Sequence, residues 1–233
     1  MAVLAACLLS ASCSVNSGLV LKKDGSATAT ARVESSAPFL EYVMGVADVV
    51  GMKDLAKQGR IYDLKEIQKG LESGPGVTVK RIASPKPEVL DVDVAFRSVT
   101  EIFAKDPTVK GSGVLSISES GGKKTLRLHL DRNNFKQLSV LFPILDNPMF
   151  SGMGPQSNEG TSEEDYLAMM EYAMGAEGPK AIRNASIDLT VRVEGEILSQ
   201  TGGSLSGGTA VFHFPLIRLL LLDKPIDLSV TYR

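Results

Sequence analysis

The sequence has no tryptophan, two histidines and two cysteines among its 233 residues. Both cysteines, Cys7 and Cys13, lie in the apolar leader, which excludes a disulfide framework and a cysteine-based metal site from the rest of the chain. Aromatic residues make up only 6%, so a stacking platform for bases or sugars would depend on tyrosine and phenylalanine. The formal net charge of -2 gives no bias toward nucleic acid, and we expect no nucleic-acid partner.

Common catalytic motifs are also missing from the sequence. It has no Gly-x-Ser-x-Gly, no His-Glu-x-x-His and no phosphate-binding loop. His129 and His213 alternate with strand hydrophobics, which is typical of sheet-surface residues. Asp91 and Asp93 lie two apart on one strand, a spacing more typical of solvated side chains than of a catalytic pair. Carboxylate catalysis stays open as an alternative, since its two groups need not be close in sequence. We therefore expect a protein without enzymatic activity, cofactor or metal.

The composition is that of a folded protein, with 43% hydrophobic and 22% charged residues. Residues 2–12 carry no charge and are too few to span a bilayer, which takes about 20 apolar residues. They fit the apolar core and cleavage region of a signal peptide, although the basic region that normally precedes these is missing. We therefore predict an N-terminally incomplete signal peptide over residues 1–12, followed by a single domain over 13–233.

A cysteine after small residues at the end of such a leader indicates lipid modification. Leu4-Ala5-Ala6-Cys7 matches the bacterial lipobox better than Ser10-Ala11-Ser12-Cys13, but Cys13 leaves a longer leader and directly precedes the first strand. We predict acylation, including palmitate, at Cys13, with Cys7 as the alternative. Acyl chains stabilise membrane binding by about 0.8 kcal/mol per buried methylene. Ser14 is not the aspartate that retains many lipoproteins in the inner membrane, so the outer membrane is favoured for this envelope protein.

Hydrophobic periodicity predicts an α+β fold, with an antiparallel sheet built from hairpins and covered on one face by several short helices. Asp24-Gly25, between alternating segments, indicates a hairpin turn. Helical spacing and capping residues predict helices over 37–50, from Asp63 and from Thr161 to about 174. Everything after residue 186 reads as strand, including the apolar run Leu216–Leu222.

Methionines cluster around the longest predicted loop, residues 143–160. Methionine is adaptable and suits surfaces that repack around irregular apolar ligands. A loosely packed core helix is the alternative. The candidate contacts with a ligand or partner are Met149, Met153, Tyr166, Met169, Met170 and Met174.

Both ends of the chain resemble small bacterial envelope lipoproteins of the LppM type. The similar features are Cys13 next to a strand, Leu19-Val-Leu-Lys-Lys-Asp-Gly25, Ile187–Glu194 and the glycine-rich turn at Gly202-Gly203. The chain lacks the proline usual before the glycine near Gly195, and the C-terminal membrane helix of some members. The resemblance implies lipid binding or a role at the envelope surface without catalysis, and it carries over no functional residue.

Two functions follow as hypotheses. The first is a non-catalytic envelope lipoprotein that binds an apolar ligand, such as a lipid, between its sheet and its helices. The second is a structural or assembly protein that binds another envelope protein through a sheet edge or through residues 143–175. A hollow between the layers would favour the first, and a filled core with an exposed apolar patch would favour the second.

Overall fold

The computed structural model describes residues 13–49, 61–74, 76–105, 111–137 and 153–233, and it confirms the α+β class. The strands are β1 (Cys13–Leu21), β2 (Ala27–Ser35), β3 (Val77–Ala83), β4 (Val89–Phe96), β5 (Leu115–Ser120), β6 (Lys123–Leu130), β7 (Ser186–Val193), β8 (Ile197–Thr201), β9 (Ser204–Ser206), β10 (Thr209–Pro215) and β11 (Ile226–Tyr232). The described helices are α2 (Ala37–Val49), α4 (Leu64–Glu72), α5 (Val99–Lys105), α9 (Glu163–Met174), α10 (Gly178–Asn184) and α11 (Leu216–Leu221).

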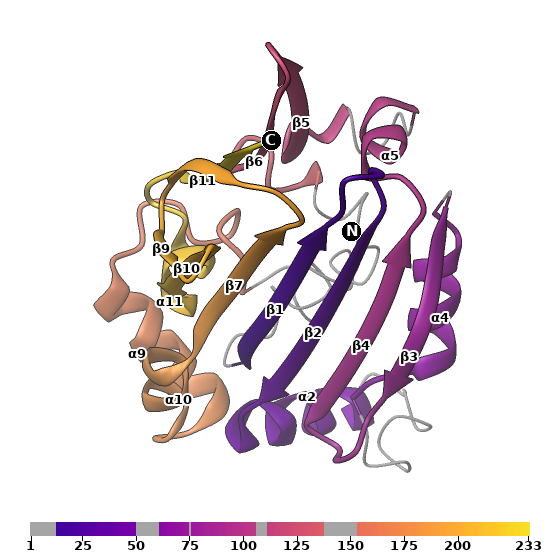
Figure 1. Cartoon of the computed structure of the whole chain (residues 1–233). Coiled ribbons are helices and arrows are strands. Elements are labelled where there is room, and N and C mark those ends of the chain that lie inside the picture. Colours follow the sequence, from indigo (N-terminus) through magenta and orange to yellow (C-terminus); the bar gives the residue numbers. More distant parts are fainter. Residues whose placement is uncertain (1–12, 50–60, 75, 106–110, 138–152) are drawn as a thin grey trace.

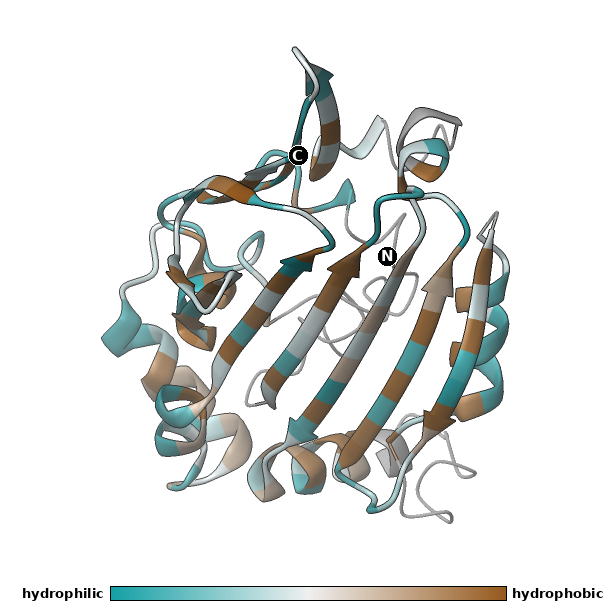
Figure 2. Ribbon diagram, in the orientation of Figure 1, coloured by the Kyte–Doolittle hydropathy of each residue, from teal (hydrophilic) through white to brown (hydrophobic). Residues whose placement is uncertain are grey.

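The strands form two sheets. The larger has seven strands in the order β3-β4-β2-β1-β7-β10-β9, and the smaller has four in the order β5-β6-β11-β8. Alternation predicted the central strands, because one face of each is buried and the other is polar. Figure 2 shows this alternation as bands of hydrophobic and hydrophilic colour along the strands of the larger sheet.

The β1–β2 hairpin at the centre of the larger sheet confirms the turn predicted at Asp24-Gly25. Gly25 has a φ of 84°, and the Asp24 carboxylate accepts a hydrogen bond from the Ser26 backbone N–H at 2.8 Å. β1 and β7 pair in parallel, with Val15 opposite Ile187. The sequence did not predict this pairing. The larger sheet is therefore mixed, whereas the smaller one is antiparallel throughout.

Helices lie at the end of the larger sheet at which β1 and β7 begin, where Figure 1 shows α2, α9 and α10 together. The predicted cap at Asp63 is confirmed, since its carboxylate accepts hydrogen bonds from the N–H groups of Lys65 and Glu66. Ser162 caps α9 by accepting from the Asp165 N–H at 3.1 Å. None of the helices that the structure describes is long and apolar enough to cross a membrane.

One prediction for the C-terminal part is wrong. The run at Leu216–Leu221 forms α11 instead of a strand, and five of its six residues are buried. A short run that is almost entirely apolar fits a buried helix as well as a buried strand, so its pattern could not decide between them. Gly178-Pro179 begins a further short helix, α10, because proline is well suited to the first turn.

Candidate functional site

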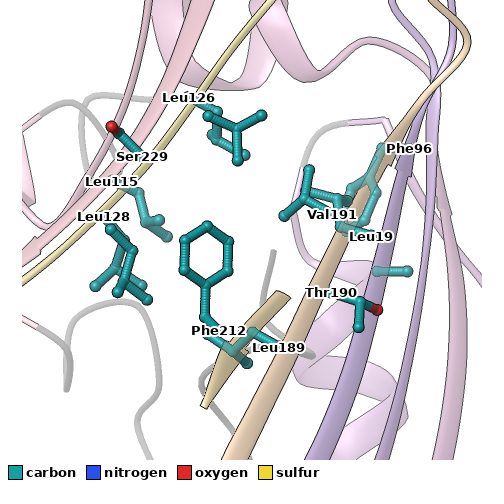
Figure 3. A pocket seen from close by; sticks show the side chains of 13 residues that line it. Leu19, Phe96, Leu115, Leu126, Leu128, Leu189, Thr190, Val191, Phe212 and Ser229 are labelled. Carbon is teal, nitrogen blue, oxygen red and sulfur yellow. The ribbon is translucent and has the colours of Figure 1, made fainter. Parts of the chain in front are cut away.

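An apolar hollow lies between the inner faces of the two sheets. Figure 3 shows Leu19, Phe96 and Val191 of the larger sheet across from side chains of the smaller one, with the Phe212 ring between them. Of the thirteen lining residues, two are polar, Thr190 and Ser229. The full lining is Leu19, Ala29, Phe96, Leu115, Leu126, Leu128, Leu189, Thr190, Val191, Phe212, Leu228, Ser229 and Val230.

The hollow is narrow and partly open to solvent. Its empty volume is about 630 Å³, which includes the solvent at its mouth, and the centre of a water molecule can move through about 60 Å³ of it. One water molecule needs about 10–15 Å³ of the volume that is open to its centre, so the enclosed part has room for several atoms. It can therefore take an acyl segment or a small apolar group, while a larger ligand would extend through the mouth.

Two glycines bring the sheets together at one side of the hollow. Between β8 and β9 the chain passes from the smaller sheet to the larger one through Gly202-Gly203. A Cβ on Gly202 would overlap the Asp227 carbonyl oxygen and lie 2.8 Å from Leu228 Cδ2. A Cβ on Gly203 would lie 2.5 Å from the Phe212 ring. The dipeptide was interpreted as a hairpin turn, and the structure shows that it is also the crossing at which two lining residues are packed.

The hollow lies between two sheets, whereas the first hypothesis expected the ligand between a sheet and helices. The described members of the methionine cluster do not line it. Tyr166, Met170, Met153 and Met174 are buried in the core, and Met169 on α9 is exposed. Met149 and Cys7 lie outside the described residues, and Cys13 begins β1. The chosen contact residues are therefore separate from the hollow, and their role toward a ligand or partner stays a prediction.

Buried hydrogen bonds hold the segment before α9 onto that helix. The Met153 carbonyl oxygen accepts from the Tyr166 hydroxyl at 3.1 Å and from Asn158 Nδ2 at 3.0 Å. Asn158 Nδ2 also donates to the Gly154 carbonyl at 2.8 Å. Burial raises the pKa of the Tyr166 phenol well above its usual range. These contacts give Tyr166 a structural role in anchoring residues 153–158.

Both histidines lie on outer sheet faces, as predicted. His213 Nδ1 is 2.7 Å from Asp188 Oδ1, and the Ser186 hydroxyl donates to Asp188 Oδ2 at 2.7 Å. Because the serine is bonded to the carboxylate and not to the imidazole, this trio lacks the nucleophile–base contact of a hydrolase. Among the residues that the structure describes, no group of three histidine, cysteine or acidic side chains is arranged so that it could hold a metal ion.

Charged pairs on the sheet surfaces join neighbouring strands. His129 Nδ1 lies 2.8 Å from Asp227 Oδ1, and Arg127 donates to the same oxygen at 2.6 Å. The Arg127 hydrogen bond, followed by that of His129, lowers the pKa of the Asp227 carboxyl. Asp91 accepts from Arg32 of the neighbouring strand at 2.8 Å. Such exposed pairs contribute little stability each and fix strand neighbours.

No family model matches the chain, and no curated protein matches its sequence. Among solved structures, the folded domain of LppM from Mycobacterium tuberculosis, determined by NMR, is similar to it. The match covers 95% of this chain and 90% of that domain, with 13% sequence identity and a TM-score of 0.45. This is a distant resemblance.

Proposed function

We propose that this protein is a non-catalytic lipoprotein of the bacterial cell envelope that binds an apolar ligand between its two sheets. The observation that carries the proposal is the inter-sheet hollow, which is open to solvent and lined almost entirely by apolar side chains. Open hollows with apolar walls and few polar groups are the usual form of small-molecule sites. Membrane attachment through acylated Cys13 would keep such a protein close to a supply of apolar molecules.

The dimensions of the hollow define the kind of ligand. Thr190 and Ser229 are the only polar residues of the described lining, and each lies between two inward-facing apolar neighbours on its strand, so recognition rests on apolar burial and shape more than on hydrogen bonds. Each methylene that enters contributes about 0.8 kcal/mol before the loss of ligand motion is subtracted. A lipid with a segment of one chain inserted and the rest of the molecule outside the mouth fits both the wall chemistry and the enclosed volume.

The test is lipid analysis of the full chain with one matched pair of variants. Ala29 on β2 lines the hollow and is buried, so Ala29→Leu should fill part of the free space. Ala95 on β4 alternates with the inward-facing Val94 and Phe96, so Ala95→Leu makes the same change on the other face of the sheet.

Native protein would be purified, its bound lipids extracted and identified by mass spectrometry, and its binding of the uncharged dye N-phenyl-1-naphthylamine measured. We expect wild type and Ala95→Leu to retain lipid and dye, and Ala29→Leu to lose most of both while remaining folded by circular dichroism. Empty wild-type protein in repeated preparations, or equal binding by both variants, would contradict the proposal.

A further inference from the structure

The register of the larger sheet places the ends of several strands and helices beside Cys13. Cys13 pairs with Ser35, the last residue of β2, and α2 begins two residues later at Ala37. Because β1 and β7 are parallel, the start of β7 at Ser186, just after α10, lies at the same end. β1 begins at Cys13 itself, so an acyl group on this residue would be attached directly to the first residue of the sheet. Whatever attaches at Cys13 therefore leaves the domain among α2, α9 and α10 (Figure 1).

One of these helices, α2, has apolar residues beside its buried face that are only partly covered. Its only charged residues are Glu41 and Asp48. Phe39 and Val43 are buried in the core, but Leu40 and Met44 are only partly covered. A helix that is apolar on most sides normally lies within a core or against a membrane.

Helix α9, which packs on α2 and α10, adds two large hydrophobic side chains that are exposed to solvent. Tyr172 is 96% exposed and Met169 is 41% exposed, and their spacing of three residues puts them on the same side of the helix. Of the three large hydrophobic side chains exposed in the described part of the chain, these are two. An exposed tyrosine with an apolar neighbour suits the boundary between lipid chains and water.

We propose that the helical end of the domain rests on the bilayer, with Tyr172 and Met169 of α9 and the partly exposed apolar side of α2 inserted at the lipid–water boundary. This inference rests on the proposed anchoring at Cys13, because the anchor brings that end to the membrane. The exposed charges described on α2, on α9 and on α10 with its N-cap residue are mainly acidic, namely Glu41, Glu163, Glu164, Asp165, Glu171 and Glu177 against Lys180 and Arg183. Contact with the bilayer is therefore driven by apolar insertion, and we expect it to be independent of salt on uncharged lipid and not to be strengthened by anionic lipid.

The absence of tryptophan makes insertion directly measurable. Tyr172→Trp gives the full chain a single indole at the proposed contact. Lys23→Trp is the control, because Lys23 is exposed in the turn at the other end of β1. β1 has nine residues, and its eight residue-to-residue steps of roughly 3.3 Å separate the two ends by about 26 Å. Each variant would be reconstituted into phosphatidylcholine vesicles with and without brominated chains, at low and high salt.

We expect brominated lipid to abolish most of the fluorescence of Tyr172→Trp, to leave Lys23→Trp unquenched, and to act equally at both salt concentrations. Equal quenching of both variants would mean that the domain lies flat, and no quenching of either would mean that it is only tethered. If a protein partner covers the indole of Tyr172→Trp in place of lipid, neither variant is quenched. Each of these results would overturn the inference.

The intact mass of the same samples separates this inference from the anchoring proposal. Quenching without the added mass of acyl chains would support the insertion of the helical end and refute the anchor at Cys13. Added acyl mass without quenching would support the anchor and refute the insertion. The ligand proposal is tested separately, since Leu19 and Ala29 of the hollow lie toward the turn end of the β1–β2 hairpin.

Discussion

Tyr166 provides a sharp test of the packing around α9. Its side chain is fully buried, and its hydroxyl donates to the Met153 carbonyl oxygen at 3.1 Å. Tyr166→Phe removes this hydrogen bond and leaves the ring. Because Asn158 Nδ2 still donates to the same carbonyl, no buried acceptor is orphaned. At neutral pH we therefore expect the free energy of unfolding to fall by only about 1 kcal/mol.

At alkaline pH the same substitution should become stabilising. Burial raises the pKa of the Tyr166 phenol above the unfolded value of about 10. The stability that the neutral phenol contributes is fully present below about pH 10 and is lost as the pH rises toward the folded pKa. The loss is about 1.4 kcal/mol per pH unit, so the wild-type and Tyr166→Phe curves should cross within about one unit above pH 10.

Urea unfolding followed by circular dichroism between pH 7 and pH 11.5 measures both effects. Lysines and the other tyrosines titrate in both proteins, so only the difference between the two curves is interpreted. Tyr172→Phe is the control, because its ring is 96% exposed and contacts little of the fold. If wild type and Tyr166→Phe lose stability in parallel above pH 10, the phenol is not buried as the structure shows.

Two further predictions concern the crossing between the sheets and the anchor. Gly203→Ala should lower the free energy of unfolding, measured in urea, by about 1–3 kcal/mol, because its Cβ would lie 2.5 Å from the Phe212 ring. The control Gly70→Ala, in the open interior of α4, should raise it by about 0.5–1 kcal/mol. An equal effect of both substitutions would contradict the close crossing. Metabolic labelling with an alkyne fatty acid should be lost in Cys13→Ala and kept in Cys7→Ala, and label retained in both variants or absent from wild type would remove the anchor.

The elements that could be predicted from the sequence are those defined by local chemistry. Asp24-Gly25 specifies its hairpin because glycine accepts the positive φ of the turn. Asp63 specifies the start of α4 because its carboxylate satisfies two free N–H groups. In both cases the determining interaction spans only two or three residues, so it can be predicted from residues that are adjacent in the sequence.

The division into two sheets depends on contacts that are remote in sequence. β1 pairs with β7, with Val15 opposite Ile187, and a strand that alternates hydrophobic and polar residues can pair in either direction. β6 pairs with β11, with Leu128 opposite Leu228. Nothing in the local pattern assigns a hydrophobic face to one sheet or the other, so the sequence could predict inward-facing residues but not what they face.

The sequence did not predict the hollow between the sheets for the same reason, and its pattern indicated the methionines as ligand contacts instead. Met170 and Met174 fill the core beneath α9, as the alternative of a core helix required, and only Met169 of that helix's methionines reaches the surface. Leu19 and Phe212 look like ordinary core residues in the sequence, yet both line the hollow. A cavity arises where two buried faces fail to fill the space between them, which is a property of their separation and not of either strand alone. The site that we propose for an apolar molecule is therefore encoded by residues that no motif marks, and it can be recognised only when both sheets are in place.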